Sequence, residues 1–163
     1  MDGLERFNGL AEEAAVAELL AVCHSRRWAE RVAAGRPYPD LDALQAAADE
    51  VWLELGPADW LEAFEAHPRI GESGGRSAEW SRQEQAGVGG ADAAVRERLA
   101  AGNAEYKRRF GHVFLISAAG RDAAELLDAL QARLGNDPET ELRVAAGEHR
   151  RITRLRLERL MQP

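Results

Sequence analysis

The chain has 163 residues, with 28 acidic and 21 basic side chains and a formal net charge of −7. This length suits one domain with one sizeable hydrophobic core. The basic residues form no long run, which argues against nucleic-acid binding because phosphate neutralisation needs a clustered basic surface. No apolar stretch approaches the roughly 20 residues of a membrane-spanning helix, so no membrane association is expected.

Cysteine usage indicates the redox compartment. Cys23 is the one cysteine, so an intramolecular disulfide is impossible. The first residues, Met1-Asp-Gly-Leu-Glu5, lack the charged and apolar regions of a secretory signal. Both observations favour a reducing compartment, and we expect a cytoplasmic protein.

Helix-forming residues dominate the chain, and β-branched residues are sparse. Cap residues and apolar spacing set the expected helix bounds. The predicted helices, in chain order, are 8–23 capped by Asn8, 25–35 capped by Ser25, 40–55 opened by Asp40, 57–66, 81–87, 92–110, 122–134 and 138–161.

One apolar run, Val113-Phe-Leu-Ile116, has strand composition. Four residues cannot build a sheet, so we interpret the run as a buried extended segment. The sequence therefore predicts an all-α fold, a single compact domain of about eight helices over residues 1–163. We find no internal repeat and no domain linker.

The most informative residues for chemistry follow the helix predicted over 57–66. Proline disfavours the α region for the residue before it, so His67, preceding Pro68, is expected at a helix end. A histidine there suits proton transfer near neutral pH. A short helix then carries Glu84 and Gln85. Ser81 with Glu84 also matches a capping box, which would explain that pair without any function.

Other catalytic chemistries are weakly indicated. His24, His112 and His149 are isolated, and no pair of ligands has the spacing of a zinc site, so no metal is expected. No Gly-x-Ser-x-Gly elbow marks a serine nucleophile.

The C-terminal part of the last predicted helix carries Arg150, Arg151, Arg154, Arg156 and Arg159, which alone would suggest a solvated face. Arg154 and Arg156 lie two residues apart, so they point in nearly opposite directions and only one can face inward. Arg156 flanks the apolar face, and a buried guanidinium needs a partner such as a carboxylate or ureido oxygen. The sequence leaves open which of the two faces a pocket.

The motifs together resemble a known family, the 2-oxo-4-hydroxy-4-carboxy-5-ureidoimidazoline (OHCU) decarboxylases of urate breakdown. The resemblance rests on His67-Pro-Arg-Ile-Gly-Glu72 and Trp80-Ser-Arg-Gln-Glu-Gln-Ala-Gly87. It extends over nearly the whole chain, through Phe7-Asn8, Cys23 to Trp28, Arg36-Pro37, Tyr106 to Gly111, Phe114 to Arg121, Leu134 to Asp137 and Ile152 to Leu157. The chain departs from the family pattern at His24 and at His112-Val113.

The resemblance implies a cofactor-free, all-helical and usually dimeric enzyme. It would convert OHCU to (S)-allantoin with loss of CO2, beside urate oxidase and hydroxyisourate hydrolase. His67 would be the general acid or base, and Glu84 would polarise the substrate hydroxyl or orient the histidine. The implied substrate-binding residues are Pro68, Gln85, Leu115, Ile116, Ser117, Ala118 and Arg156.

Two other hypotheses remain at this point. A non-enzymatic helical module would bind a partner through the apolar and arginine faces of the last helix. A metal-dependent hydrolase is a weaker alternative. The sequence does not exclude either one, although a scaffold has no need of His67-Pro68 together with Glu84-Gln85.

Overall fold

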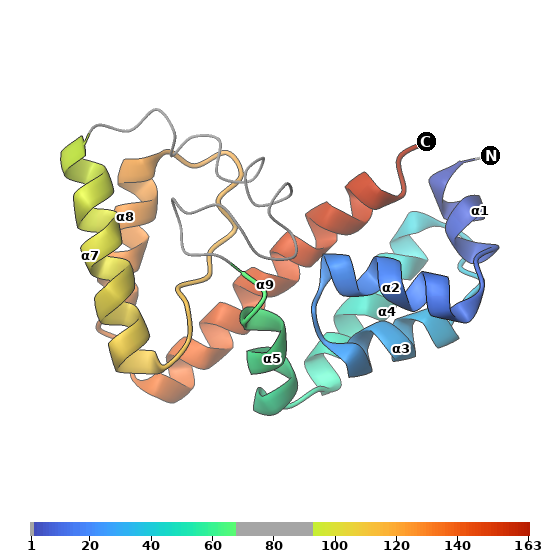
Figure 1. Ribbon diagram of the computed structural model, residues 1–163, viewed down its shortest axis with the longest axis horizontal. Helices are drawn as coiled ribbons and strands as arrows, with labels where there is room; N and C mark the ends of the chain where they lie inside the picture. Colours follow the sequence, from blue (N-terminus) through green and yellow to red (C-terminus); the bar gives the residue numbers. More distant parts are fainter. Residues whose placement is uncertain (1, 68–92) are drawn as a thin grey trace. The chain divides into compact units, whose positions relative to one another are not determined.

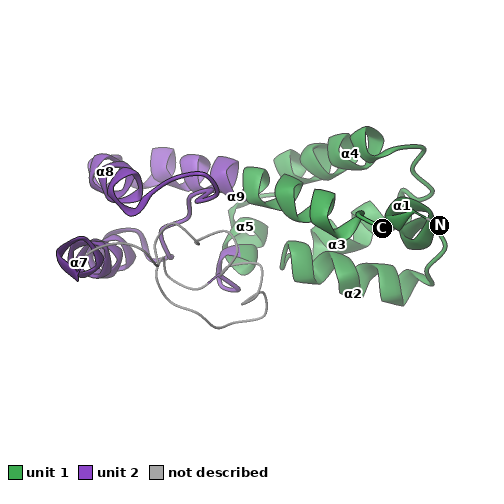
Figure 2. Cartoon of the chain, turned by 90° about the horizontal axis from the view of Figure 1, so that it is seen from above, with its two compact units in different colours: residues 1–63, 150–163 green, residues 64–149 purple. Residues whose placement is uncertain are grey.

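A computed structural model describes residues 2–67 and 93–163, and within these ranges it contains eight α-helices (Figure 1). The predicted all-α fold class is therefore confirmed. Backbone contacts divide the chain into two compact units, residues 1–63 with 150–163 and residues 64–149 (Figure 2). The single domain expected over residues 1–163 stays a prediction. The helix predicted over 81–87 lies outside the described residues.

Unit 1 consists of the N-terminal helices and the end of the last helix. Within it α2 packs on α3, and α3 packs on α4. Its helices are α1 (Gly3–Asn8), α2 (Glu12–Val22), α3 (Arg26–Ala34), α4 (Leu41–Glu54), α5 (Pro57–Phe64) up to Ala63, and α9 (Pro138–Leu160) from Arg150 onward.

Two predicted caps of unit 1 are confirmed. The Ser25 hydroxyl accepts a hydrogen bond from the Trp28 amide at the start of α3, and the Asp40 carboxylate accepts one from the Ala43 amide at the start of α4. Each bond satisfies an amide that has no partner inside its own helix.

The first predicted helix, 8–23, is wrong. Two helices occupy this region, and Asn8 ends α1 instead of capping a longer helix. Asp2 caps α1, whereas Ala11 opens α2 without any side-chain hydrogen bond. Asn8 instead exchanges two hydrogen bonds with the Tyr38 backbone, at 2.9 and 3.0 Å. An asparagine outside a helix interior often bonds backbone in this way.

Unit 2 contains α7 (Ala93–Phe110), α8 (Ala123–Arg133), the first part of α9 and an extended segment over 113–118. In Figure 1, α7 and α8 lie side by side, and the two helices contact each other. The extended segment is non-helical and largely buried, as predicted. The hydrophobic core of unit 2 consists of Leu99, Tyr106, Phe114, Ile116, Ala118, Ala123, Leu126, Leu127 and Leu130.

The remaining bounds agree with the predicted helices to within two residues. Helix α5 ends at Phe64 and is followed by a turn, two residues earlier than expected. Among the described residues, no helix is long and apolar enough to cross a membrane.

Candidate active site

The predicted site residues divide into three groups. Pro68, Glu84 and Gln85 lie outside the described residues. His67 and the segment 115–118 belong to unit 2. Arg156 belongs to unit 1, and its surroundings are described within that unit.

His67 lies outside the helix and shortly after the end of α5, consistent with the expectation from the His-Pro step. A turn follows Phe64, and the His67 amide donates to the Phe64 carbonyl oxygen at 3.1 Å. This bond closes the last turn and fixes the backbone from which the imidazole projects. The side chain is half-buried.

Three histidines and Phe64 form a ring cluster in unit 2. The His149 ring meets the His67 ring edge to face, with 4.9 Å between ring centroids. Phe64 packs on both His149 and His112, at 5.7 and 5.3 Å. His112 also contacts Tyr106, at 5.5 Å. We call His67, His112, His149 and Phe64 the histidine cluster.

Burial distinguishes the members of this cluster. Phe64 is 1% exposed, His149 is fully buried and His112 is 7% exposed, whereas His67 is half-buried. His67 is thus the histidine of the cluster that retains access to solvent or to a small molecule.

His112 occupies a position where the sequence departs from the family pattern. Burial lowers the pKa of its imidazole, and this outweighs the hydrogen bond to the Val113 backbone that raises the pKa. The ring is therefore neutral near pH 7. Its Nδ1 lies 3.0 Å from the Val113 carbonyl oxygen, an acceptor, so Nδ1 carries the proton. A neutral His112 can therefore occupy a buried position where the family often has an apolar residue.

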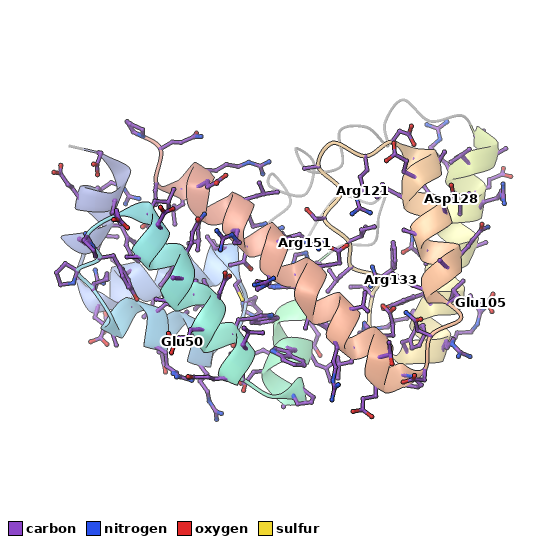
Figure 3. All side chains as sticks on the ribbon, turned by 180° about the vertical axis from the view of Figure 1, so that it is seen from behind. Glu50, Glu105, Arg121, Asp128, Arg133 and Arg151 are labelled. Atoms are coloured by element: carbon purple, nitrogen blue, oxygen red, sulfur yellow. The ribbon has the colours of Figure 1, made fainter. Side chains whose placement is uncertain are left out.

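The extended segment is buried and bonded to α8. Leu115, Ile116 and Ala118 are at most 5% exposed. The Arg133 guanidinium donates from Nη1 to the Leu115 carbonyl oxygen at 2.6 Å. Figure 3 shows Arg133 among the side chains of this unit, with Arg121 near the end of the segment. Arg121 forms an ion pair with Glu148 at 3.8 Å.

Within unit 1 the two arginines of α9 differ in burial and in partners. The Arg154 guanidinium pairs with Asp49 of α4 at 2.6 Å and donates to Gln45 Oε1 at 3.2 Å, and its side chain is 44% exposed. Arg156 is only 2% exposed, and its Nη1 donates to the Val22 carbonyl oxygen at 3.0 Å. Arg156 is therefore the inward-facing member of the pair.

Cys23 does not have the properties of a nucleophile. Its thiol is buried, and burial raises its pKa to about 12, with only partial compensation from the Ser25 backbone and the Arg156 charge. The reactive thiolate is thus absent at neutral pH. Within the described ranges, no three His, Cys, Asp or Glu side chains are grouped to hold a metal ion.

Sequence reasoning missed two residues of this region, His149 and Arg133. Arg133 follows Leu126 and Leu130 at helical spacing, so it continues the apolar face of α8. His149 similarly follows the buried Ala145 and Ala146 on α9. In both cases the available signal was a polar residue at a position that the helical period assigns to the core.

Comparison with known proteins gives a consistent result. The family model described as OHCU decarboxylase matches residues 8–158. The chain is 34% identical over 157 residues to the uric acid degradation bifunctional protein TTL of Arabidopsis thaliana, covering 93% of this chain and 48% of that protein. It is 34% identical to a 2-oxo-4-hydroxy-4-carboxy-5-ureidoimidazoline decarboxylase of Amia calva, covering 82% of this chain and 79% of the relative.

A solved structure agrees with these relatives. The crystal structure of OHCU decarboxylase in the presence of (S)-allantoin superposes with a TM-score of 0.80 at 34% identity, covering 88% of this chain and 96% of that one. The chain spans about half the length of the Arabidopsis relative and a larger share of the Amia calva relative and of the solved structure.

Proposed function

Because the chain belongs to the OHCU decarboxylase family, we propose that it converts OHCU to (S)-allantoin with release of CO2. The family match over residues 8–158 supports a carboxy-lyase and disfavours the partner-binding module. The observation that carries the proposal is the histidine cluster, in which two buried histidines leave His67 as the accessible imidazole.

The substrate contains its own electron acceptor. When the bond between the carboxylate and the hydroxyl-bearing carbon breaks, its electron pair can move toward the adjacent C=N bond of the ring. The ring nitrogen that receives this electron pair takes up one proton. The carbon of the former C=N bond then takes up a proton, and the hydroxyl oxygen loses its proton to become a carbonyl. Overall, the carboxylate form of OHCU and one proton give allantoin and CO2. The protein then contributes positioning, proton transfer and charge stabilisation.

His67 suits the proton transfer in this scheme. Its backbone is bonded to Phe64 in the turn after α5, and its imidazole meets the buried His149 ring edge to face, which restricts ring rotation. Protonation from one face of a planar intermediate yields one enantiomer. A fixed acid on one side of the ring therefore accounts for a single enantiomer, which we propose is (S)-allantoin.

The other site roles follow from the residue types. Glu84 would polarise the substrate hydroxyl or orient His67, and Pro68 would pack against the ring. Gln85 and Arg156 would hold the ureido and carbonyl oxygens, because amide and guanidinium groups donate to such acceptors. Backbone groups of Leu115, Ile116, Ser117 and Ala118 would bind the ring edge.

The pathway setting is part of the same proposal. Two relatives are named as bifunctional proteins of uric acid degradation, from Arabidopsis thaliana and Bacillus subtilis. We place this chain after urate oxidase and hydroxyisourate hydrolase, as a cytoplasmic homodimer. Light scattering after size-exclusion chromatography tests the dimer, and a monomer mass near 17.9 kDa would contradict it.

The site assignment is tested with His67→Asn and Glu84→Gln. General acid–base catalysis contributes about 10²- to 10⁴-fold, so we expect each variant to lower kcat by at least about 100-fold with an unchanged far-UV spectrum. The control is Glu97→Gln, on the exposed side of α7, which should retain wild-type kcat. Wild-type activity in both site variants would contradict the assignment.

A further inference from the structure

A buried ion pair links α8 to α9 within unit 2. Arg133 of α8 is 8% exposed, and Glu141 in the first turn of α9 is fully buried. The Arg133 Nε donates to both Glu141 carboxylate oxygens, at 3.1 and 3.0 Å, and Nη2 donates to Oε2 at 2.6 Å. This is the fork geometry in which guanidinium and carboxylate bind most strongly.

Two further side chains donate hydrogen bonds to the Glu141 carboxylate. The Tyr106 hydroxyl of α7 donates to Glu141 Oε2, and the Asn136 amide donates to Oε1 at 3.1 Å. Burial and the neighbouring carboxylate together raise the pKa of Tyr106, so its hydroxyl remains a donor. Glu141 therefore receives hydrogen bonds from α7, from α8 and from the connection between α8 and α9.

Arg133 is the member of this network that reaches the extended segment. Its Nη1 donates to the Leu115 carbonyl oxygen at 2.6 Å, and its guanidinium carbon lies 4.5 Å from the centre of the Phe114 ring. One planar group thus binds Glu141 on one edge and the Leu115 backbone on the other.

Stability alone does not explain an ionic network here. Desolvation of two charges cancels much of their attraction, and well-packed apolar residues often stabilise such a position equally well. A guanidinium held in a fork does provide a fixed hydrogen-bond direction, which an apolar side chain cannot. The network is therefore suited to fixing the path of the backbone at Leu115.

We propose that Arg133, anchored by Glu141, is a positioning residue that holds the backbone of Leu115–Ala118 in the conformation that binds the substrate ring. The inference rests on the proposed function, because that function makes this segment a wall of the binding site. Arg133 does not touch the reacting atoms, and we expect its effect chiefly on substrate binding.

Arg133→Lys is the principal variant. An ammonium is a compact donor that cannot bind the Glu141 carboxylate as a fork and reach the Leu115 carbonyl at the same time. We expect KM for OHCU to rise about tenfold, the equivalent of one lost hydrogen bond, while kcat changes less than about threefold.

Tyr106→Phe is the matched comparison. It keeps the ring and removes one hydrogen bond to Glu141, yet it leaves the Arg133–Leu115 bond in place. We expect it to lower thermal stability but to keep KM within about twofold. Arg143→Lys, in the exposed pair with Glu139, controls for an arginine replacement as such.

Hydrogen exchange provides a readout that needs no activity. In Arg133→Lys, amides of the segment 114–118 should exchange about tenfold faster than in wild type, whereas Tyr106→Phe should leave them unchanged. If Arg133→Lys fails to fold, Glu141→Gln takes its place, because a neutral amide anchors the guanidinium less firmly.

The outcomes separate the two proposals. A wild-type protein without (S)-allantoin production would overturn the proposed function, while exchange would still report the role of Arg133. An active wild type in which Arg133→Lys and Tyr106→Phe raise KM and exchange equally would overturn the positioning role, because both effects would then follow from stability alone.

Discussion

His149 presents its ring to His67 in an edge-to-face contact, with 4.9 Å between centroids and an interplanar angle of 78°. His149 is fully buried on α9, whereas His67 follows the end of α5 and is half-buried. A rigid, buried ring thus forms one wall for the residue to which we assign proton transfer. Aromatic contacts of this geometry are worth about 0.5–1.5 kcal/mol beyond the area they bury.

Replacement of His149 tests this wall. His149→Phe keeps a ring of similar size, so we expect kcat within about threefold of wild type. His149→Ala removes the ring and leaves a cavity, which should cost about 2–4 kcal/mol of unfolding free energy and lower kcat by about tenfold or more. Steady-state kinetics and urea denaturation provide the two values. An equal loss of kcat in both variants would show that the aromatic contact is not what orients His67.

The stability of the protein should fall in mild acid because of His112. Burial lowers its pKa in the folded state, so the unfolded chain binds this proton first as the pH decreases. The contribution of neutral His112 to the unfolding free energy is complete above the pKa of about 6.5 that this group has in the unfolded chain. It is lost as the pH falls toward and through the lower pKa of His112 in the folded protein.

His112→Phe removes this titration. The variant loses the hydrogen bond to Val113 and should be the less stable protein at pH 7.5. Between pH 7.5 and 5.5 the difference in unfolding free energy should shift in favour of the variant. A difference that is constant with pH would contradict a depressed pKa at His112.

The buried carboxylate Glu141 should dominate the stability of unit 2. Glu141→Ala leaves the Arg133 charge buried with its main acceptor removed, and breaking such a pair costs about 3–5 kcal/mol. Glu139→Ala, two residues away on the same helix, removes an exposed pair with Arg143 and should leave stability nearly unchanged. Thermal denaturation of the two variants provides the comparison. Similar effects at both positions would contradict the account.

The two arginines of α9 should differ in their effect on turnover. Arg154 is occupied by Asp49 and Gln45 on the outside of unit 1, so Arg154→Ala should keep kcat/KM within about twofold. Arg156 is buried, and Arg156→Lys should raise KM by about tenfold or more because an ammonium cannot reproduce a guanidinium fork. Circular dichroism checks that both variants are folded. The opposite order of effects would assign substrate binding to Arg154.

Much of the fold could be predicted because helix ends in this chain have local causes. Ser25 and Asp40 cap their helices through bonds to residues three positions later, so the sequence contains the whole interaction. The break between α1 and α2 could not be predicted in the same way. Ala11 offers no side-chain cap, and Asn8 bonds Tyr38, thirty residues away.

In the candidate site, too, local features could be predicted and contacts between distant residues could not. The helix end at His67 follows from the proline beside it, a local effect. Contacts of His149 with His67, and of Arg133 with Glu141 and Leu115, join residues from separate elements. A polar residue on an apolar helix face indicates that a partner exists, but only the folded structure identifies that partner.

The most direct test of the central claim is circular dichroism during urate oxidation by urate oxidase and hydroxyisourate hydrolase, with and without this protein. We expect a rapid rise of the (S)-allantoin signal only when the protein is present. The same signal should be lost with His67→Asn and retained with Glu97→Gln. A slow decay to racemic product that the wild-type protein does not alter would contradict the decarboxylase assignment.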